Sequence, residues 1–238
     1  MSKGLGAFVT AIATLLLVAL SVPAQAIEDP ALKSELLRLA RDWEHVKLQV
    51  RDRDEQERQM ANLAERAGKI AEQYENIPDP IVWVGIITSE QASLASDSGS
   101  PMKALELAKR ARDILEKVEK TNPETMDAGA PTILGVLYDR VPGFPIGFGD
   151  TARARHYLRE ATKSAPDGLD ANFFYGDFLY KHGERCEAVK ILERALTLPE
   201  LSNRPLWDKS LRAAIRRILS ETQNAVRHRT ECEANILR

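Results

Sequence analysis

The chain has 238 residues, a formal net charge of −2, and charged side chains at 29% of its positions. This balanced charge does not indicate a nucleic-acid partner, which would require a clustered basic face. Aromatic residues make up only 6% of the chain, and strong helix formers such as Ala, Leu, Glu, Arg and Lys dominate. The composition therefore predicts an all-α protein.

Residues 1–26 have the pattern of a secretory signal peptide. Lys3 gives a positive start, Ala7–Val22 is mostly apolar, and Ala24–Ala26 is a small-x-small cleavage signal. A retained membrane anchor is the alternative, but the apolar stretch is short for a spanning helix, which needs about 20 residues. No Cys stands directly after the cleavage signal, so a lipid anchor is not indicated. We expect cleavage after Ala26 and a periplasmic or secreted protein without a stable membrane anchor.

The remaining chain, residues 27–238, is expected to form one helical domain in three parts. Residues 27–78 predict an N-terminal helical hairpin, residues 79–202 predict the repeats, and residues 203–238 predict a C-terminal capping helix. No long linker or low-complexity segment separates these parts, which favours a single domain.

The hairpin is predicted to begin at Asp29 and Pro30, which suit the N-cap and the first helical position. Apolar residues recur at steps of three and four from Leu32 to Val50, and again from Met60 onward. A sustained coiled coil is the alternative, but too few heptads are visible in each helix. We favour the first pair of a helical array.

The next helices are predicted at residues 81–96 and 102–120, with a turn between them. We interpret this pair as a degenerate repeat. The capping helix is predicted from Leu206 to about residue 227, and its excess of arginine suits a solvated outer face. Those arginines are Arg212, Arg216, Arg217 and Arg227.

Two copies of one spacing pattern lie between residues 134 and 199. The first places Gly135 before Ala154, Leu158, Ala161 and Pro166, and the second places Gly176 before Ala188, Leu192, Ala195 and Pro199. A tetratricopeptide helix pair has these features, because small residues let its two helices approach closely. We predict antiparallel helix pairs stacked as a tetratricopeptide-like solenoid, with Asp150 and Asp167 as helix N-caps.

The first copy has a longer turn between its helices than the second. The added segment, Val141–Gly149, is unusually apolar for a solvated loop and contains Phe144 and Phe148. One interpretation is that both rings pack on their own repeat. The other is that the loop forms a hydrophobic lid over a ligand groove or a partner surface.

The first helix of each pair is expected to line the concave face of the stack. The positions expected there, together with the loop rings, mix aromatic, acidic and basic side chains, which suit a peptide or a small organic ligand. The predicted binding residues are Thr132, Val136, Asp139, Arg140, Phe144, Phe148, Asp170, Phe173, Asp177, Tyr180 and Lys181. Ordinary surface is the alternative interpretation.

The two cysteines, Cys186 and Cys232, both lie in the part that is expected to be exported. An even count in an oxidising compartment favours a disulfide between them. Two buried free thiols are the alternative, since Cys also behaves as a small apolar residue.

The sequence contains no recognisable catalytic or metal-binding pattern. His182 lies four residues before Cys186, but Gly183 at the intervening helix turn argues against a shared helix face. No HExxH, CxxC or nucleophile-elbow motif is present. We therefore expect neither an enzyme nor a cofactor.

Three segments resemble the exported bacterial tetratricopeptide proteins that are grouped with the T component of TRAP transporters. They are Leu134–Tyr138, Val141–Asp150 and Asp170–Leu179. The resemblance implies a periplasmic helical scaffold that binds a small apolar ligand and partners a solute-binding protein. Some members of that family are lipoproteins, and this chain departs from them because it lacks a lipobox Cys. A weaker similarity is to the eukaryotic regulators of microtubule dynamics, whose role the signal peptide argues against.

Two functions follow from these observations. The first is an exported scaffold whose concave face, roofed by Val141–Gly149, binds a protein or peptide partner. The second is a carrier of a small apolar ligand that is associated with a periplasmic TRAP-type transporter. In the second case the apolar pocket is expected to be lined by Phe144, Phe148, Phe173 and Tyr180.

Overall fold

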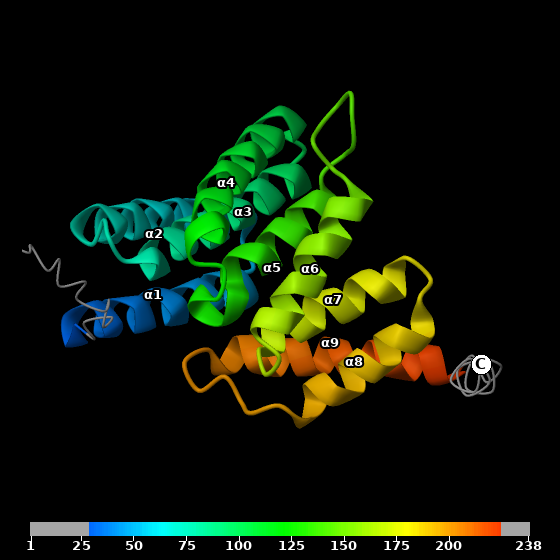
Figure 1. Ribbon diagram of the computed structural model, residues 1–238. Coiled ribbons are helices and arrows are strands. Elements are labelled where there is room, and N and C mark those ends of the chain that lie inside the picture. The colour runs from blue at the N-terminus through cyan, green and yellow to red at the C-terminus, as the bar shows by residue number, and fades with distance from the viewer. Residues whose placement is uncertain (1–28, 225–238) are drawn as a thin grey trace, which may run out of the picture.

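The computed structural model describes residues 29–224, which form nine α-helices and no named strand (Figure 1). The helices are α1 (Pro30–Gln49), α2 (Arg53–Gln73), α3 (Pro78–Asp97), α4 (Pro101–Thr121), α5 (Thr125–Arg140), α6 (Thr151–Ser164), α7 (Leu169–Lys181), α8 (Arg185–Thr197) and α9 (Pro205–Asn224). The all-α prediction is confirmed. Within this part of the chain, no helix combines the length and apolarity needed to cross a membrane.

Aspartate side chains cap the starts of α1, α2 and α6. Asp29 caps α1 as predicted, since its carboxylate accepts a hydrogen bond from the backbone N of Ala31 at 2.8 Å. Asp150 likewise caps α6, at 2.9 Å from the backbone N of Ala152. The prediction for Asp167 was wrong. Gly168 holds the N-cap position of α7, and the Asp167 carboxylate instead pairs with an arginine of α8.

Three helix pairs share one close contact between a glycine and a leucine. The contacts are Gly85 with Leu115 in α3–α4, Gly135 with Leu158 in α5–α6, and Gly176 with Leu192 in α7–α8. A Cβ added to any of these glycines would come within 2.4–2.5 Å of the leucine side chain. The helix pair α3–α4 therefore has the same glycine–leucine contact as the two pairs recognised from sequence.

The helices form a curved stack that closes on itself. Along the inner side, α3 packs on α5, α5 on α7, and α7 on α9, while α1 also packs on α9 (Figure 1). The helices α4, α6 and α8 each lie on the partner helix of their own pair. The structure is thus a helical-repeat solenoid whose first and last described helices meet.

The junction between α1 and α9 is buried and specific. The Trp43 and Trp207 rings lie 5.0 Å apart between centroids, edge to face. Glu44, which is 1% exposed, accepts a hydrogen bond from the backbone N of Trp207 at 2.9 Å. Arg41 donates to the carbonyl oxygen of Ser202 at 2.7 Å. The Glu44 carboxylate thereby satisfies one backbone N–H group in the first turn of α9, where these groups have no partner inside the helix.

The outer face predicted for the capping helix needs one correction. Arg216 and Arg217 are exposed, but Arg212 is only 9% exposed. Its guanidinium pairs with Asp208 at 2.9 Å and donates to the carbonyl oxygens of Leu196 and Leu198. Arg212 therefore satisfies carbonyl groups at the C-terminal end of α8. Arg227, like the predicted signal peptide, lies outside the described residues.

The start of α5 has an unusual backbone. Met126, Asp127 and Ala128 all have positive φ angles between 53° and 60°. The right-handed part of the helix therefore begins after them, which places Pro131 near its N-terminus. Proline is tolerated there because the early N–H groups lack partners within the helix in any case.

Candidate functional site

A cavity of about 630 Å³ opens on the inner side of the stack. It is bounded by side chains from α1, α3, α4, α5, α7 and α9, and by the loop after α5. Its size falls within the range of about 300–1,000 Å³ typical of small-molecule sites. It exists because α1 and α9 meet and complete the ring of helices.

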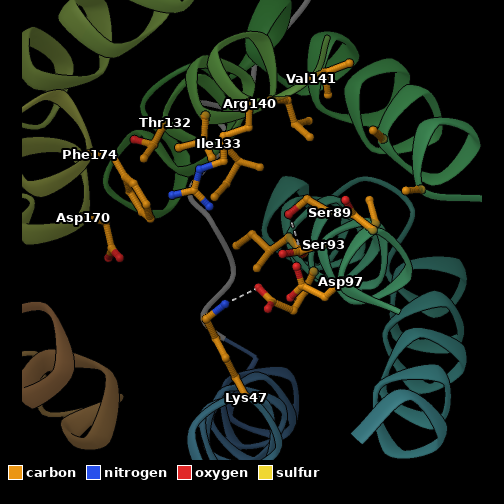
Figure 2. Close-up of a pocket in the computed structure, with 18 of the residues that line it drawn as sticks. Lys47, Ser89, Ser93, Asp97, Thr132, Ile133, Arg140, Val141, Asp170 and Phe174 are labelled. Atoms are coloured by element: carbon orange, nitrogen blue, oxygen red, sulfur yellow. Dashed lines mark hydrogen bonds and ion pairs between the residues drawn. The ribbon is translucent and has the colours of Figure 1, made fainter. Parts of the chain in front are cut away.

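The walls of this cavity are mainly apolar. Two aromatic pairs contribute: Trp43 with Trp207, and Phe173 with Phe174, whose centroids lie 5.1 Å apart. Aliphatic side chains complete the walls, among them Ile86, Ile133, Val136, Leu137, Leu211 and Ala214. Figure 2 shows Ile133 and Phe174 on facing sides of the open space. Such a lining favours an apolar ligand.

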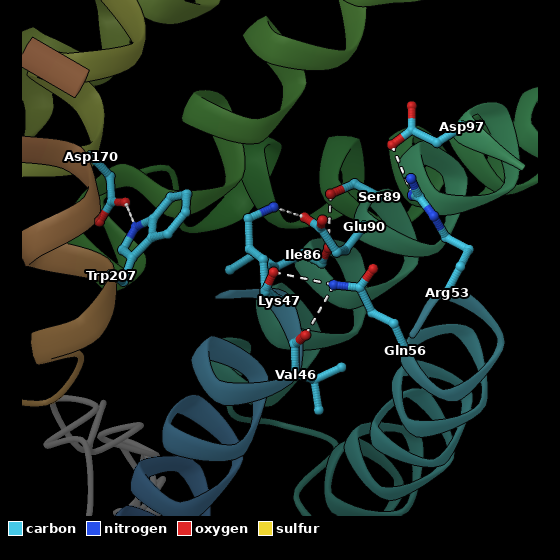
Figure 3. Close-up of polar contacts among 10 residues, drawn as sticks. All are labelled: Val46, Lys47, Arg53, Gln56, Ile86, Ser89, Glu90, Asp97, Asp170 and Trp207. Atoms are coloured by element: carbon cyan, nitrogen blue, oxygen red, sulfur yellow. Dashed lines mark hydrogen bonds and ion pairs between the residues drawn. The ribbon is translucent and has the colours of Figure 1, made fainter. Parts of the chain in front are cut away.

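Asp170 ties α7 to α9 at one side of the cavity. Its carboxylate accepts a hydrogen bond from the indole Nε1 of Trp207 at 2.6 Å (Figure 3). The same carboxylate pairs with Arg204 at 2.6 Å. Both charged side chains are largely buried, at 22% and 14% exposure. This shared acceptor fixes the position of the Trp207 ring in the cavity wall.

Lys47 of α1 and Glu90 of α3 form an ion pair in the cavity lining (Figure 3). The Lys47 Nζ also lies 5.7 Å from the Trp43 ring centroid and 5.4 Å from that of Trp207. A cation at this distance is attracted to the face of an indole ring. The charge of Lys47 is therefore already balanced by neighbours.

Five of the eleven predicted binding residues line the cavity. They are Thr132, Val136, Arg140, Asp170 and Phe173. They belong to α5 and α7, the first helices of the two pairs recognised from sequence. These two helices therefore face the cavity at these five positions.

Four predicted residues on α5 and α7 have polar partners outside the cavity. Asp139 is hydrogen bonded to His182 at 2.8 Å. Asp177 pairs with Lys181 at 2.6 Å, one helical turn apart. The Tyr180 hydroxyl donates to a carboxylate of α9 at 3.0 Å. The cavity ends before these turns of α7, and Asp139 of α5 contacts α7's C-cap residue His182 instead of the cavity.

The two loop phenylalanines do not line the cavity. Phe148 packs on its own repeat, 5.3 Å from the Tyr138 ring centroid and 4.5 Å below the guanidinium carbon of Arg112. Phe144 is 94% exposed. Of the pocket predicted from Phe144, Phe148, Phe173 and Tyr180, only Phe173 contributes. The loop instead supplies Val141, Pro142 and Ile146 to the cavity rim.

Sequence reasoning missed the contributions of α1, α3, α4 and α9 to the cavity, and that of Phe174 in α7. The missed residues include Trp43, Lys47, Ile86, Glu90, Phe174, Arg204 and Trp207. One signal was available, because the chain has only 3 tryptophans. Their rings meet at Trp43, which lies 5.0 Å from Trp207 and 5.8 Å from Trp83 between centroids, although Trp83 does not line the cavity. No spacing rule connects residues so far apart in the chain.

Only one cysteine of the predicted disulfide lies within the described residues. Cys186 lies in the first turn of α8, while Cys232 lies outside the described residues. The bond between them stays a prediction, which the intact mass after alkylation without reductant would test: two alkylated thiols would contradict it. Within residues 29–224, no group of three or more His, Cys, Asp and Glu is arranged to hold a metal ion.

Comparisons with known proteins identify no family for this chain. No protein-family model matches the chain, and no curated protein matches it. One similar solved structure is a de novo designed helical repeat protein, DHR64, with a TM-score of 0.34 and 20% identity. The match covers 82% of this chain and 97% of the designed one.

Proposed function

We propose that this protein is a non-enzymatic binding protein that holds a small, largely apolar ligand in the cavity between α1 and α9. The observation that carries the proposal is the cavity of about 630 Å³ with Trp43, Trp207, Phe173 and Phe174 in its walls. Burying apolar ligand surface there would contribute roughly 25 cal/mol per Å² before the cost of association. The signal-peptide pattern makes the protein an exported one in this proposal.

The resemblance to the T component of TRAP transporters agrees with the proposal. The Gly and Leu contacts of α5–α6 and α7–α8 are compatible with a tetratricopeptide-type scaffold. A ligand carrier beside a periplasmic solute-binding protein would use such a scaffold. The structure supports the ligand cavity more directly than it supports this partner.

A partner protein that covers the cavity mouth is the second candidate. Three exposed apolar side chains favour it: Met102 at 80% exposure, Phe144 at 94% and Ile146 at 70%. Met102 and Ile146 also line the cavity, so the exposed group continues its rim. Exposed apolar patches of this kind often mark interaction surfaces.

Native mass spectrometry of the protein purified from the periplasm without refolding tests the proposal first. A small co-purifying mass that is lost on denaturation is the expected result. A bare chain that also fails to bind apolar probes in titrations of tryptophan fluorescence would contradict it. A complex with a second protein would favour the partner function instead.

A cavity-filling variant locates the ligand. Val136→Phe places extra volume in the cavity, so probe binding should be strongly weakened while the fold is retained. Ala213→Phe adds the same ring type at an exposed position of α9 outside the cavity and should leave probe binding unchanged. Equal effects of the two substitutions would place the ligand elsewhere.

A further inference from the structure

The charged side chains that line the cavity are almost fully paired. Lys47 pairs with Glu90, and Arg204 pairs with Asp170. Asp97 pairs with Arg53 of α2, at 3.2 Å. Arg140 is the one charged residue in the described lining that none of these pairs includes.

Arg140 has no carboxylate partner among residues 29–224. Its sequence neighbour Asp139 is hydrogen bonded to His182 instead. The guanidinium carbon of Arg140 lies 5.9 Å from the ring centroid of Phe174. Figure 2 shows the guanidinium reaching into the open space between Phe174 and Ile133. The side chain thus brings an uncompensated positive charge to an apolar cavity.

We infer that the ligand of this cavity is an amphiphile with one anionic group, and that Arg140 binds that group while the apolar part lies against the aromatic walls. This inference rests on the proposed function and names its ligand class. A guanidinium presents a planar set of donors that matches a carboxylate or phosphate in a two-point hydrogen bond. The exposed position of Arg140 keeps the anionic group close to solvent, so its desolvation is only partial.

The test compares three probes that share one alkyl chain: dodecanoate, dodecanol and dodecyltrimethylammonium, each below its micelle concentration. Binding is followed by tryptophan fluorescence, because Trp43 and Trp207 line the cavity and Trp83 touches Trp43. We expect dodecanoate to bind roughly tenfold more tightly than dodecanol, as one charge-assisted hydrogen bond would give. The cationic probe should bind most weakly.

Three variants assign the preference to Arg140. Arg140→Gln should remove the difference between dodecanoate and dodecanol, and Arg140→Lys should keep part of it, because the charge stays while the planar fork is lost. Arg216→Gln is the matched control, since it removes an exposed helix cation outside the cavity and should leave the preference intact. Higher salt should reduce the wild-type preference, because Arg140 is exposed to screening.

The outcomes separate the inference from the proposed function. Equal binding of dodecanoate and dodecanol by the wild type, or a preference for the cation, overturns the anionic ligand and leaves the apolar cavity standing. A preference that survives in Arg140→Gln overturns the role of Arg140. Failure of all three probes to bind the wild type overturns the proposed function and the inference with it.

Discussion

Two regions of the molecule are built in different ways. Inside each of three helix pairs, a glycine of the first helix faces a leucine of the second, and the same contact recurs along the chain. The cavity has no repeated element: its walls come from five helices of the inner side and from α4, and Trp43 and Trp207 are more than 160 positions apart. The repeats therefore supply a scaffold, while the site depends on where the two ends of the stack meet.

Stability should depend most strongly on the leucine of the repeated glycine contact. Leu192→Ala removes a fully buried side chain and should lower the free energy of unfolding by about 2–5 kcal/mol. Leu37→Ala, at a position that is 44% exposed, should cost little. Urea unfolding measures both. Similar costs for the two substitutions would remove the distinction between the repeat contact and ordinary surface.

Asp170 is expected to be the most sensitive polar residue of the cavity wall. Asp170→Ala removes the shared acceptor of Trp207 and Arg204, and should cost about 1.5–3 kcal/mol because it leaves a partly buried arginine unpaired. The tryptophan emission should also shift, since Trp207 loses its hydrogen bond.

Asp177→Ala on the same helix is the control for Asp170. Its pair with Lys181 is one turn apart on the helix, so the loss should be only about 0.3–0.5 kcal/mol, without a change in emission. If the two aspartates behaved alike, Asp170 would not be the residue that joins α7 to α9.

A smaller effect is expected when a glycine of the repeat is filled. Gly176→Ala places a Cβ 2.5 Å from the Leu192 side chain, and overpacking should cost about 1–3 kcal/mol. Gly68→Ala in α2 meets nothing within 4 Å and should instead stabilise the protein by about 0.5–1 kcal/mol. In a Leu192→Ala background the cost of Gly176→Ala should shrink, which a double-mutant cycle measures. An additive cycle would contradict the direct contact.

The smallest predicted loss tests a helix cap. Asp150→Ala removes the acceptor for the backbone N of Ala152 and should cost about 1 kcal/mol. Asp167→Ala should lie within about 0.5 kcal/mol of the wild type, because Asp167 is exposed and caps no helix. Thermal unfolding at one pH measures both. Equal losses would restore the N-cap role that the sequence predicted for Asp167.

Local patterns in the amino-acid sequence were enough to predict the helices and their pairing within the repeats. Helical periodicity, the Asp29-Pro30 start and the glycine and alanine positions act over a few residues or one helix pair, so their physical effect is visible as a spacing. Even so, the third glycine contact, at Gly85, was overlooked because its pair looked degenerate.

The cavity, and which of the predicted residues line it, depend on the tertiary structure. The packing of α1 on α9 brings Trp43, Lys47 and Trp207 together, and it selects Asp170 and Phe173 of α7 while leaving Asp177 outside. This selection depends on the curvature accumulated over the whole stack. Each helix pair contributes a small rotation, so the meeting of the two ends is a sum over all repeats that no local spacing encodes.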